Sequence, residues 1–178
     1  MSVREDIAAV KRRDPAARSS FEIWLLYSGL HAVWGYRFAH WLWTHRAKFL
    51  GRLVSQVTRF LTGVEIHPGA TIGRRLIIDH GMGIVIGETA EVGDDVLLYH
   101  GVTLGNAKAV PGKRHPTIGS RVTVGAGAKI FGPVVIGDDT VIGGNAAVTK
   151  SFPAGSILVG VPAKDVSKKV DQADLWTI

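Results

Sequence analysis

The chain has 178 residues and carries 21 Lys and Arg against 15 Asp and Glu, a formal net charge of +6. The basic excess lies in residues 1–63. These basic side chains either form a solvated helical face or attract an anionic ligand or partner. These basic residues are dispersed and accompany no known reading motif, so nucleic acid is not an expected partner.

The composition also bears on the compartment. The sequence contains no cysteine, which excludes disulfides. Its first residues are polar and charged, unlike a secretion signal. The longest uncharged apolar run, residues 23–36, is shorter than the about 20 residues that a bilayer span needs. We therefore expect a cytoplasmic protein without a membrane partner.

Helix signals dominate the first third of the chain. Ser2 and Glu5 have capping-box spacing, which predicts a short helix that ends before Asp14. Apolar residues at i, i+3 and i+4 predict further helices over about residues 28–46 and 48–61. We expect the tryptophans of this region to fill a core between the helices and the end of the next domain; they are Trp24, Trp34, Trp41 and Trp43.

A spacing of six residues organises the rest of the chain. The series consists of Ile66, Ile72, Ile78, Ile84, Ala90, Val96, Val102, Ile118, Val124, Ile130, Ile136, Ile142 and Val148. Neither the helical period of 3.6 nor the strand period of 2 explains this spacing, whereas a hexapeptide repeat that builds a parallel β-helix does. One hexad cannot bury its own aliphatic residue, so the hexads are expected to stack into coils around one core.

Three hexads make a coil of about 18 residues, so we expect Ile66, Ile84 and Val102 to stack in one column. Glycines between the hexads are expected to form tight turns, through positive φ or through the lack of a Cβ; they are Gly73, Gly87, Gly93, Gly119, Gly125, Gly137 and Gly143.

The period breaks once, between Val102 and Ile118, where the chain exceeds one hexad by ten residues. Residues 106–115 are polar, basic and contain Pro-Gly, which predicts a loop extruded from the coil. The predicted fold is therefore α+β: a helical N-terminal region of residues 1–63, a left-handed parallel β-helix of residues 64–162 with one extruded loop, and a tail of residues 163–178.

Charged and imidazole side chains gather around this repeat, at Glu65, Asp79, His80, Arg114 and His115. Glu65 precedes His80 by 15 residues, less than one coil, so its carboxylate is expected to reach the imidazole around a corner. A carboxylate that accepts from one ring nitrogen leaves the other nitrogen as a base. No serine or cysteine of the protein stands beside this pair, which leaves a hydroxyl or amine of the substrate as the nucleophile.

Two other readings use the same histidines. Each imidazole can simply satisfy turn carbonyls. Alternatively, His80, His100 and His115 could hold zinc, as in a β-helix metal enzyme of the carbonic anhydrase type, although they lack the close paired spacing of such ligands.

Several segments resemble bacterial serine O-acetyltransferases over about residues 14–163. They are Glu65-Ile-His-Pro-Gly, Ile78-Asp-His-Gly-Met-Gly, His100-Gly-Val-Thr-Leu-Gly, Gly112-Lys-Arg-His-Pro and Gly160-Val-Pro-Ala. The hexads alone indicate only a wider acyltransferase superfamily, whereas the Asp-His-Gly and Lys-Arg-His-Pro motifs narrow it to serine acetylation. An acetyltransferase of this fold with a sugar as acceptor remains an alternative.

The resemblance implies transfer of the acetyl group from acetyl-CoA to the L-serine hydroxyl, the first step of cysteine biosynthesis from serine. It implies that His80 is the general base and that Glu65, where many members have Asp, supports it. The serine-binding residues that it implies are Asp14, Asp79, Arg114 and His115. A guanidinium can pair bidentately with the α-carboxylate, and a carboxylate can meet the ammonium.

For acetyl-CoA, a co-substrate, the resemblance implies backbone contacts at Gly105, Ala126 and Gly144. From their charge, we expect Lys129 and Lys164 to meet its phosphates. No other cofactor and no metal is expected.

The resemblance also implies a homotrimer, with a hexamer as the alternative, and active sites between neighbouring subunits. It implies that the C-terminal Ile178 binds O-acetylserine sulfhydrylase (cysteine synthase), and that cysteine inhibits at the serine site. A non-catalytic scaffold that docks the sulfhydrylase through this tail is a further alternative.

Overall fold

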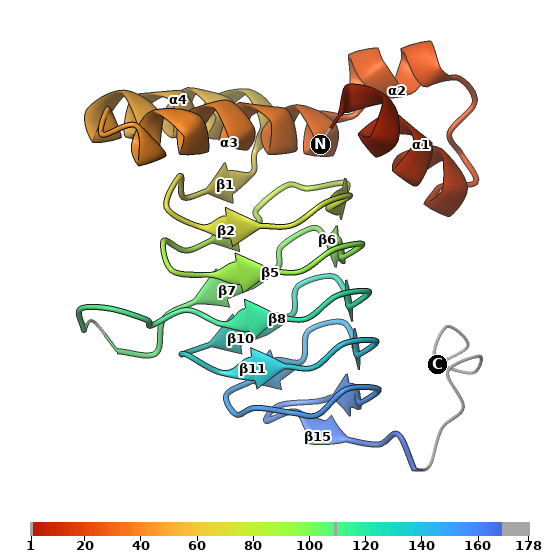
Figure 1. The fold of residues 1–178 in the computed structure, drawn as a ribbon. Helices are drawn as coiled ribbons and strands as arrows, with labels where there is room; N and C mark the ends of the chain where they lie inside the picture. Colours follow the sequence, from red (N-terminus) through yellow and green to blue (C-terminus); the bar gives the residue numbers. More distant parts are fainter. Residues whose placement is uncertain (1, 109, 169–178) are drawn as a thin grey trace.

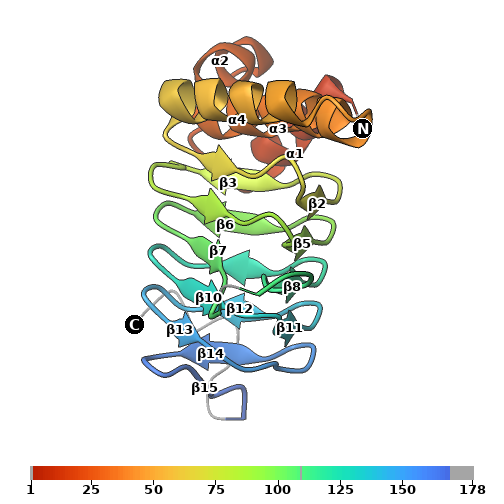
Figure 2. The ribbon, with the colours of Figure 1, turned by 90° about the vertical axis from the view of Figure 1, so that its left-hand side faces the viewer.

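The structure is a computed structural model that describes residues 2–108 and 110–168. Four helices come first, and they are α1 (Val3–Arg13), α2 (Ser20–Leu26), α3 (Ser28–Thr44) and α4 (Lys48–Thr62). Short strands then wind downward as a parallel β-solenoid, and α3 and α4 lie across its upper end (Figures 1 and 2). The predicted fold class is confirmed.

The strands stack into three sheets. The first holds β1 (Glu65–Ile66), β4 (Val85–Ile86), β7 (Thr103–Gly105), β10 (Lys129–Phe131) and β13 (Ala147–Val148). The second holds β2 (Thr71–Ile72), β5 (Glu91–Val92), β8 (Thr117–Ile118) and β11 (Val135–Ile136). The third holds β3 (Ile77–Asp79), β6 (Leu97–Tyr99), β9 (Thr123–Val124), β12 (Val141–Ile142), β14 (Ile157–Val159) and β15 (Lys164–Asp165). β15 is antiparallel to β14 and closes this sheet.

Local caps mark several helix ends, including the cap predicted at Ser2. Ser2 Oγ accepts a hydrogen bond from the Glu5 N–H, and Ser19 Oγ accepts one from the Glu22 N–H. Gly63 ends α4 with φ +72°, a conformation that glycine adopts without a Cβ penalty. Local sequence signals therefore determine where these helices begin and end.

The thirteen hexad positions are all buried, but the predicted column is wrong. Ile66 pairs with Ile86, and Ile86 pairs with Leu104. The reason is a second break in the period: strands of the first coil pair with strands 20 residues later, as Ile77 does with Leu97. The two extra residues lie between β3 and β4. Each hexad has two inward-facing positions, two residues apart, such as Ile84 and Ile86, which are both buried. Counting by six from Ile66 therefore reaches Ile84, which is apolar, although Ile86 is the structural equivalent of Ile66.

The extruded loop follows β7, as predicted, and protrudes from the solenoid (Figure 1). Thr103 pairs with Lys129, 26 residues later, whereas Lys129 pairs with Ala147, 18 residues later. The loop therefore adds eight residues to its coil, and the expectation of ten is corrected.

The turn glycines serve by their lack of a Cβ. A Cβ on Gly73 would lie 2.8 Å from the backbone oxygen of Gly93, and one on Gly93 would lie 2.8 Å from the backbone of Gly119. None of the seven predicted turn glycines has a positive φ. Consecutive coils approach too closely here for any side chain.

The tryptophan prediction is wrong for two of four residues. Trp34 and Trp43 are half-buried, but Trp24 and Trp41 are 49% and 53% exposed. The last helix shows the same pattern: α4 turns a face of small and polar residues inward, with Gly51, Ser55 and Thr62 buried. Its apolar face is consequently exposed. In the described part of the chain, we find no helix long and apolar enough to span a bilayer.

Ion pairs fasten α1 to its neighbours. Asp6 is 2% exposed and accepts hydrogen bonds from the Arg37 guanidinium and from Trp34 Nε1, both on α3. Glu5 accepts from Arg74 and Arg75 beside β3. These contacts hold the first turn of α1 against α3 and the first coil, and Arg13 in its last turn donates a 3.3 Å hydrogen bond to Asp95 O.

Candidate active site

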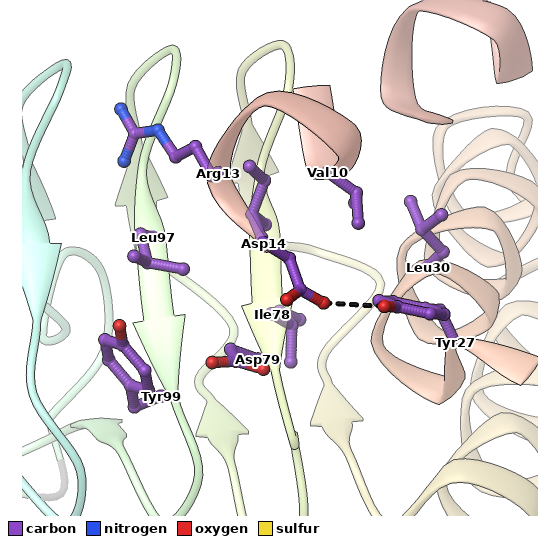
Figure 3. Close-up of a pocket in the computed structure, with 10 residues that line it drawn as sticks. Val10, Arg13, Asp14, Tyr27, Leu30, Ile78, Asp79, Leu97 and Tyr99 are labelled. Atoms are coloured by element: carbon purple, nitrogen blue, oxygen red, sulfur yellow. Dashed lines mark hydrogen bonds between the residues drawn. The ribbon is translucent and has the colours of Figure 1, made fainter. Parts of the chain in front are cut away.

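A cavity of about 270 Å³ opens where the helical region meets β3. Its lining includes Asp14, Tyr27, Ser28, Asp79 and His80. A smaller cavity of about 40 Å³ adjoins it and shares Asp14, Tyr27 and Asp79 (Figure 3). The sequence prediction that Asp14, Asp79 and His80 contribute to one site therefore agrees with their placement, although Asp14 comes from a different region of the chain.

The close approach of α3 to β3 shapes this cavity. Gly29 lies in the first turn of α3, and a Cβ there would lie 2.1 Å from the Ile78 carbonyl oxygen. Only glycine permits this contact. It holds α3 against the strand that ends in Asp79.

Asp14 has a defined orientation. The Tyr27 hydroxyl donates a hydrogen bond of 2.6 Å to Asp14 Oδ2, and the Ala16 N–H donates one of 2.8 Å to Oδ1 (Figure 3). The hydrogen bond to Asp14 raises the pKa of Tyr27 to about 12, because a phenolate beside the carboxylate would repel it. Tyr27 therefore remains a donor at neutral pH and holds the carboxylate in place.

His80 projects from the turn after β3, and its side chain is 76% exposed. Its φ of +59° is uncommon for a residue with a Cβ and is a sparsely populated, strained conformation. This turn contains the two extra residues of the first coil. The His80 Nε2 lies 3.9 Å from Asp79 Oδ1. The break in the repeat thus presents an accessible imidazole beside a carboxylate, an arrangement suited to general base catalysis.

The predicted contact between Glu65 and His80 is not formed. Glu65 Oε2 lies 3.3 Å from Arg59 Nε, and the hydrogen bonds and ion pairs of the described residues do not join it to His80. Glu65 stands on the first sheet, near the end of α4, and lines a separate cavity of about 470 Å³ with Met82 and Gly83. Within one chain, Glu65 is therefore paired with Arg59 and lines a different cavity from His80.

Arg114 and His115 lie at another corner, just before β8, where they contact the turn between β4 and β5. Arg114 Nη2 pairs with Glu88, an ion pair that lowers the pKa of Glu88. The His115 ring packs on Gly87, where a Cβ would lie 2.1 Å from Nε2. Glu88 was not predicted as a site residue, although it belongs to the Gly-Glu-Thr-Ala run that follows the Asp-His-Gly motif.

The protonation state of His115 follows from its partner. Its Nδ1 accepts a hydrogen bond of 3.2 Å from the Thr89 N–H, so a neutral ring carries its proton on Nε2. Burial, more than the nearby Arg114, lowers the pKa of His115. The ring is therefore a neutral donor. Within one chain, the predicted serine-binding residues form two separate groups, one around His80 and one around His115.

The residues predicted to contact acetyl-CoA are also separated. Ala126 and Gly144 share the His80 corner on lower coils: the Asn145 N–H donates to Ala126 O, and the Gly127 N–H donates to His100 O. Lys129 Nζ donates to Gly101 O at this same corner. Two residues lie elsewhere, Gly105 at the end of β7 and Lys164 in β15. Ile178 is outside the described residues.

The zinc alternative also maps onto two corners. The His80 and His100 rings are 6.0 Å apart between centroids, whereas His115 belongs to the β4–β5 corner. Among the residues that the structure describes, no group of three His, Cys, Asp or Glu is arranged to hold a metal ion.

Comparisons with known proteins identify relatives of this chain. Residues 115–150 match the family described as bacterial transferase hexapeptide (six repeats). A Mycobacterium tuberculosis serine acetyltransferase is 56% identical over 94% of this chain and 73% of its own length. A Helicobacter pylori serine acetyltransferase is 58% identical over 89% of this chain and 93% of its own length.

Solved structures agree as well. The Neisseria gonorrhoeae serine acetyltransferase in complex with serine has a TM-score of 0.89 at 38% identity, covering 92% of this chain and 67% of that chain. The Brucella abortus enzyme in complex with coenzyme A has a TM-score of 0.90 at 40% identity, covering 92% and 66%. Sequence identity at this level over most of the chain, on the same fold, shows that this protein belongs to the serine acetyltransferase family.

Proposed function

We propose that this protein transfers the acetyl group of acetyl-CoA to the hydroxyl of L-serine, which gives O-acetyl-L-serine and CoA and begins cysteine biosynthesis. The observation that carries the proposal is the cavity in which an exposed imidazole, His80, lies beside the carboxylates of Asp79 and Asp14. The carboxylates suit the ammonium of an amino acid, and the imidazole suits removal of its hydroxyl proton.

In the proposed reaction, His80 takes the serine hydroxyl proton as the oxygen attacks the thioester carbonyl. Asp14, which Tyr27 orients, and Asp79 bind the ammonium. Both substrates are held together, so positioning supplies much of the rate enhancement. Glu65 reaches His80 only if it leaves Arg59, so its supporting role requires a rearrangement of that ion pair.

The serine carboxylate needs a cation as its partner. Within one chain, neither Arg114 nor His115 lines the His80 cavity. We propose a homotrimer in which the His115 corner of one subunit faces the His80 corner of the next. Arg114, whose orientation Glu88 holds, then pairs with the carboxylate, and the Nε2–H of His115 donates to the substrate. A hexamer is the alternative assembly.

Acetyl-CoA is proposed to lie along the His80 corner, with its pantetheine arm against Ala126 and Gly144 and Lys129 as a nearby cation. Gly105, at the end of β7, and Lys164, in β15, lie away from this corner, and their proposed contacts require acetyl-CoA to extend beyond it. Outside the described residues, Ile178 is proposed to bind O-acetylserine sulfhydrylase. The proposed compartment is the cytoplasm, and cysteine is the proposed inhibitor at the serine site.

An acceptor panel tests the proposal. Release of free thiol from acetyl-CoA is measured with L-serine, D-serine, L-threonine, and a hexose as the sugar control. We expect a kcat/KM for L-serine well above that for every other acceptor. A sugar that reacts as well as L-serine, or thiol release that does not depend on the acceptor, would overturn the assignment.

A further inference from the structure

His100 is an exposed imidazole that the reaction proposed above does not use. It occupies the same corner of the solenoid as His80, one coil lower, and the two rings lie edge to face at 6.0 Å between centroids. The Gly101 N–H donates a 2.9 Å hydrogen bond to Met82 O and holds the two coils in register. The His100 side chain is in no hydrogen bond or ion pair between described residues, so its ring nitrogens remain available to a ligand.

The position of His100 relative to the cavity indicates which substrate it meets. The cavity with Asp14 and Asp79 lies toward the helical region from His80. His100 lies in the opposite direction, toward the coils that carry Ala126 and Gly144. If the acceptor occupies the cavity, the thioester must approach His80 from the His100 side, because the hydroxyl has to lie between the base and the carbonyl carbon. This step rests on the proposed function.

On the His100 side of His80, the reaction needs a hydrogen-bond donor to the carbonyl oxygen of the thioester. Attack on a thioester places negative charge on the carbonyl oxygen, and a hydrogen-bond donor aimed at that oxygen stabilises the transition state. A neutral imidazole carries one N–H donor. The Lys129 ammonium, which donates to Gly101 O, is a second donor group at the same corner.

We propose that His100 is a catalytic residue on the acetyl-donor side, whose ring N–H donates a hydrogen bond to the thioester carbonyl oxygen as the acceptor attacks. In this step, His80 takes the hydroxyl proton, the new C–O bond forms, and the carbonyl π electrons move onto the oxygen that His100 faces. When the tetrahedral intermediate collapses, the C–S bond breaks and CoA leaves as the thiol, with the proton that His80 returns.

Two substitutions test this role. His100→Ala removes the donor, and we expect kcat/KM for acetyl-CoA to fall at least about tenfold, toward the 10²–10³ typical of an oxyanion donor. His100→Gln keeps an N–H donor on a side chain of similar length, and we expect it to recover most of the loss. The KM for serine and the calorimetric Kd for CoA should stay within about twofold in both variants, because the bond forms at the acetyl carbonyl, which CoA lacks.

His45→Ala is the matched control, because it removes an exposed imidazole just after α3 and should leave kcat/KM unchanged. Lys129→Met tests whether the Lys129 ammonium, rather than His100, donates the hydrogen bond to the thioester oxygen. The readout is again kcat/KM for acetyl-CoA. A His100→Ala enzyme within twofold of the wild type would overturn the proposal, as would a His100→Gln enzyme as slow as His100→Ala. Failure of the proposed function is separate, because the wild-type enzyme would then not acetylate serine, and the variants would be measured with whichever acceptor reacts.

Discussion

The two regions of this protein handle their apolar residues in opposite ways. In the solenoid, the hexad residues from Ile66 to Val148 are all buried. In the helical region, many large apolar side chains are exposed; they include Phe21, Trp24, Leu26, Phe38, Trp41, Phe49, Leu53, Phe60 and Leu61. The solenoid completes its core within one chain, whereas the helices leave an apolar surface of the kind that marks interaction sites.

The active site combines the two regions. The solenoid supplies His80 and Asp79, and the helical region supplies Asp14 and Tyr27. The repeat thus provides rigid placement of the base, while packing of the helices determines where the acceptor carboxylates lie. Substitutions in the two regions should therefore have different signatures, and the following predictions run from the largest effect to the smallest.

The solenoid side of the site should control the chemical step. We expect His80→Ala to lower kcat by about 10²–10⁴, the usual contribution of a general base. Because the side chain is exposed, the melting temperature and the calorimetric Kd for CoA should change little. An enzyme that retains more than a tenth of its kcat would contradict the assignment of the base.

The contrast in burial predicts a contrast in stability. Ile130→Ala removes a fully buried side chain from the solenoid and should lower the free energy of unfolding by about 2–5 kcal/mol. Phe60→Ala removes an 88% exposed ring, and without a covering partner it should cost within about 0.5 kcal/mol. Chemical denaturation of both variants measures the difference. A large cost for Phe60→Ala together with a smaller particle in light scattering would instead show that an oligomer covers this face.

The helical side of the site should control serine binding. Tyr27→Phe removes the donor that orients Asp14, and hydrogen bonds to charged groups contribute about 1.5–3 kcal/mol. In an open cavity, water can donate to Asp14 in place of Tyr27 and restore part of this free energy. We therefore expect the KM for serine to rise about three- to tenfold. Steady-state kinetics should show kcat and the KM for acetyl-CoA within twofold of the wild type. Equal losses in both KM values would mean that the variant disturbs the whole site.

At neutral pH, the smallest effect concerns the junction between the regions. His67 packs edge to face against Trp43 of α3, and burial lowers the pKa of His67 to about 4. Since the unfolded chain binds the proton at about pH 6.5, this group's contribution to stability is present above pH 6.5 and is lost as the pH falls toward 4. His67→Gln should weaken the fall in melting temperature over this window. His45→Gln, at an exposed position, is the control, and an unchanged pH profile for His67→Gln would refute the effect.

Sequence alone predicted the regular features and one departure from them, the extruded loop, but missed the break at His80. Capping residues and the six-residue spacing predicted the helices and the solenoid because both signals are local. The break at His80 was missed because Ile84 is apolar and continues the count, although Ile86 is the residue that pairs with Ile66. Only strand register separates these two inward positions.

Long-range pairing explains the remaining differences in the site. The spacing of Glu65 and His80 permits a contact, but it does not reveal that Arg59, on a helix, competes for the carboxylate. Similarly, nothing local indicates that Gly29 meets Ile78 or that Tyr27 donates to Asp14. These contacts depend on how the helical region docks on the first coil.

The placement of Asp14, from the helical region, beside Asp79, from the solenoid, has a thermodynamic consequence. A ligand held between Asp14 and Asp79 contacts both regions, so the helices cannot separate from the solenoid without releasing it. Binding and docking are therefore linked equilibria, and a ligand at 100 times its Kd adds about 2.7 kcal/mol to the stability of the docked state. The substrate thereby adds a removable cross-link between two regions that already share buried apolar contacts, such as those of Val33 and Tyr36 with the solenoid core.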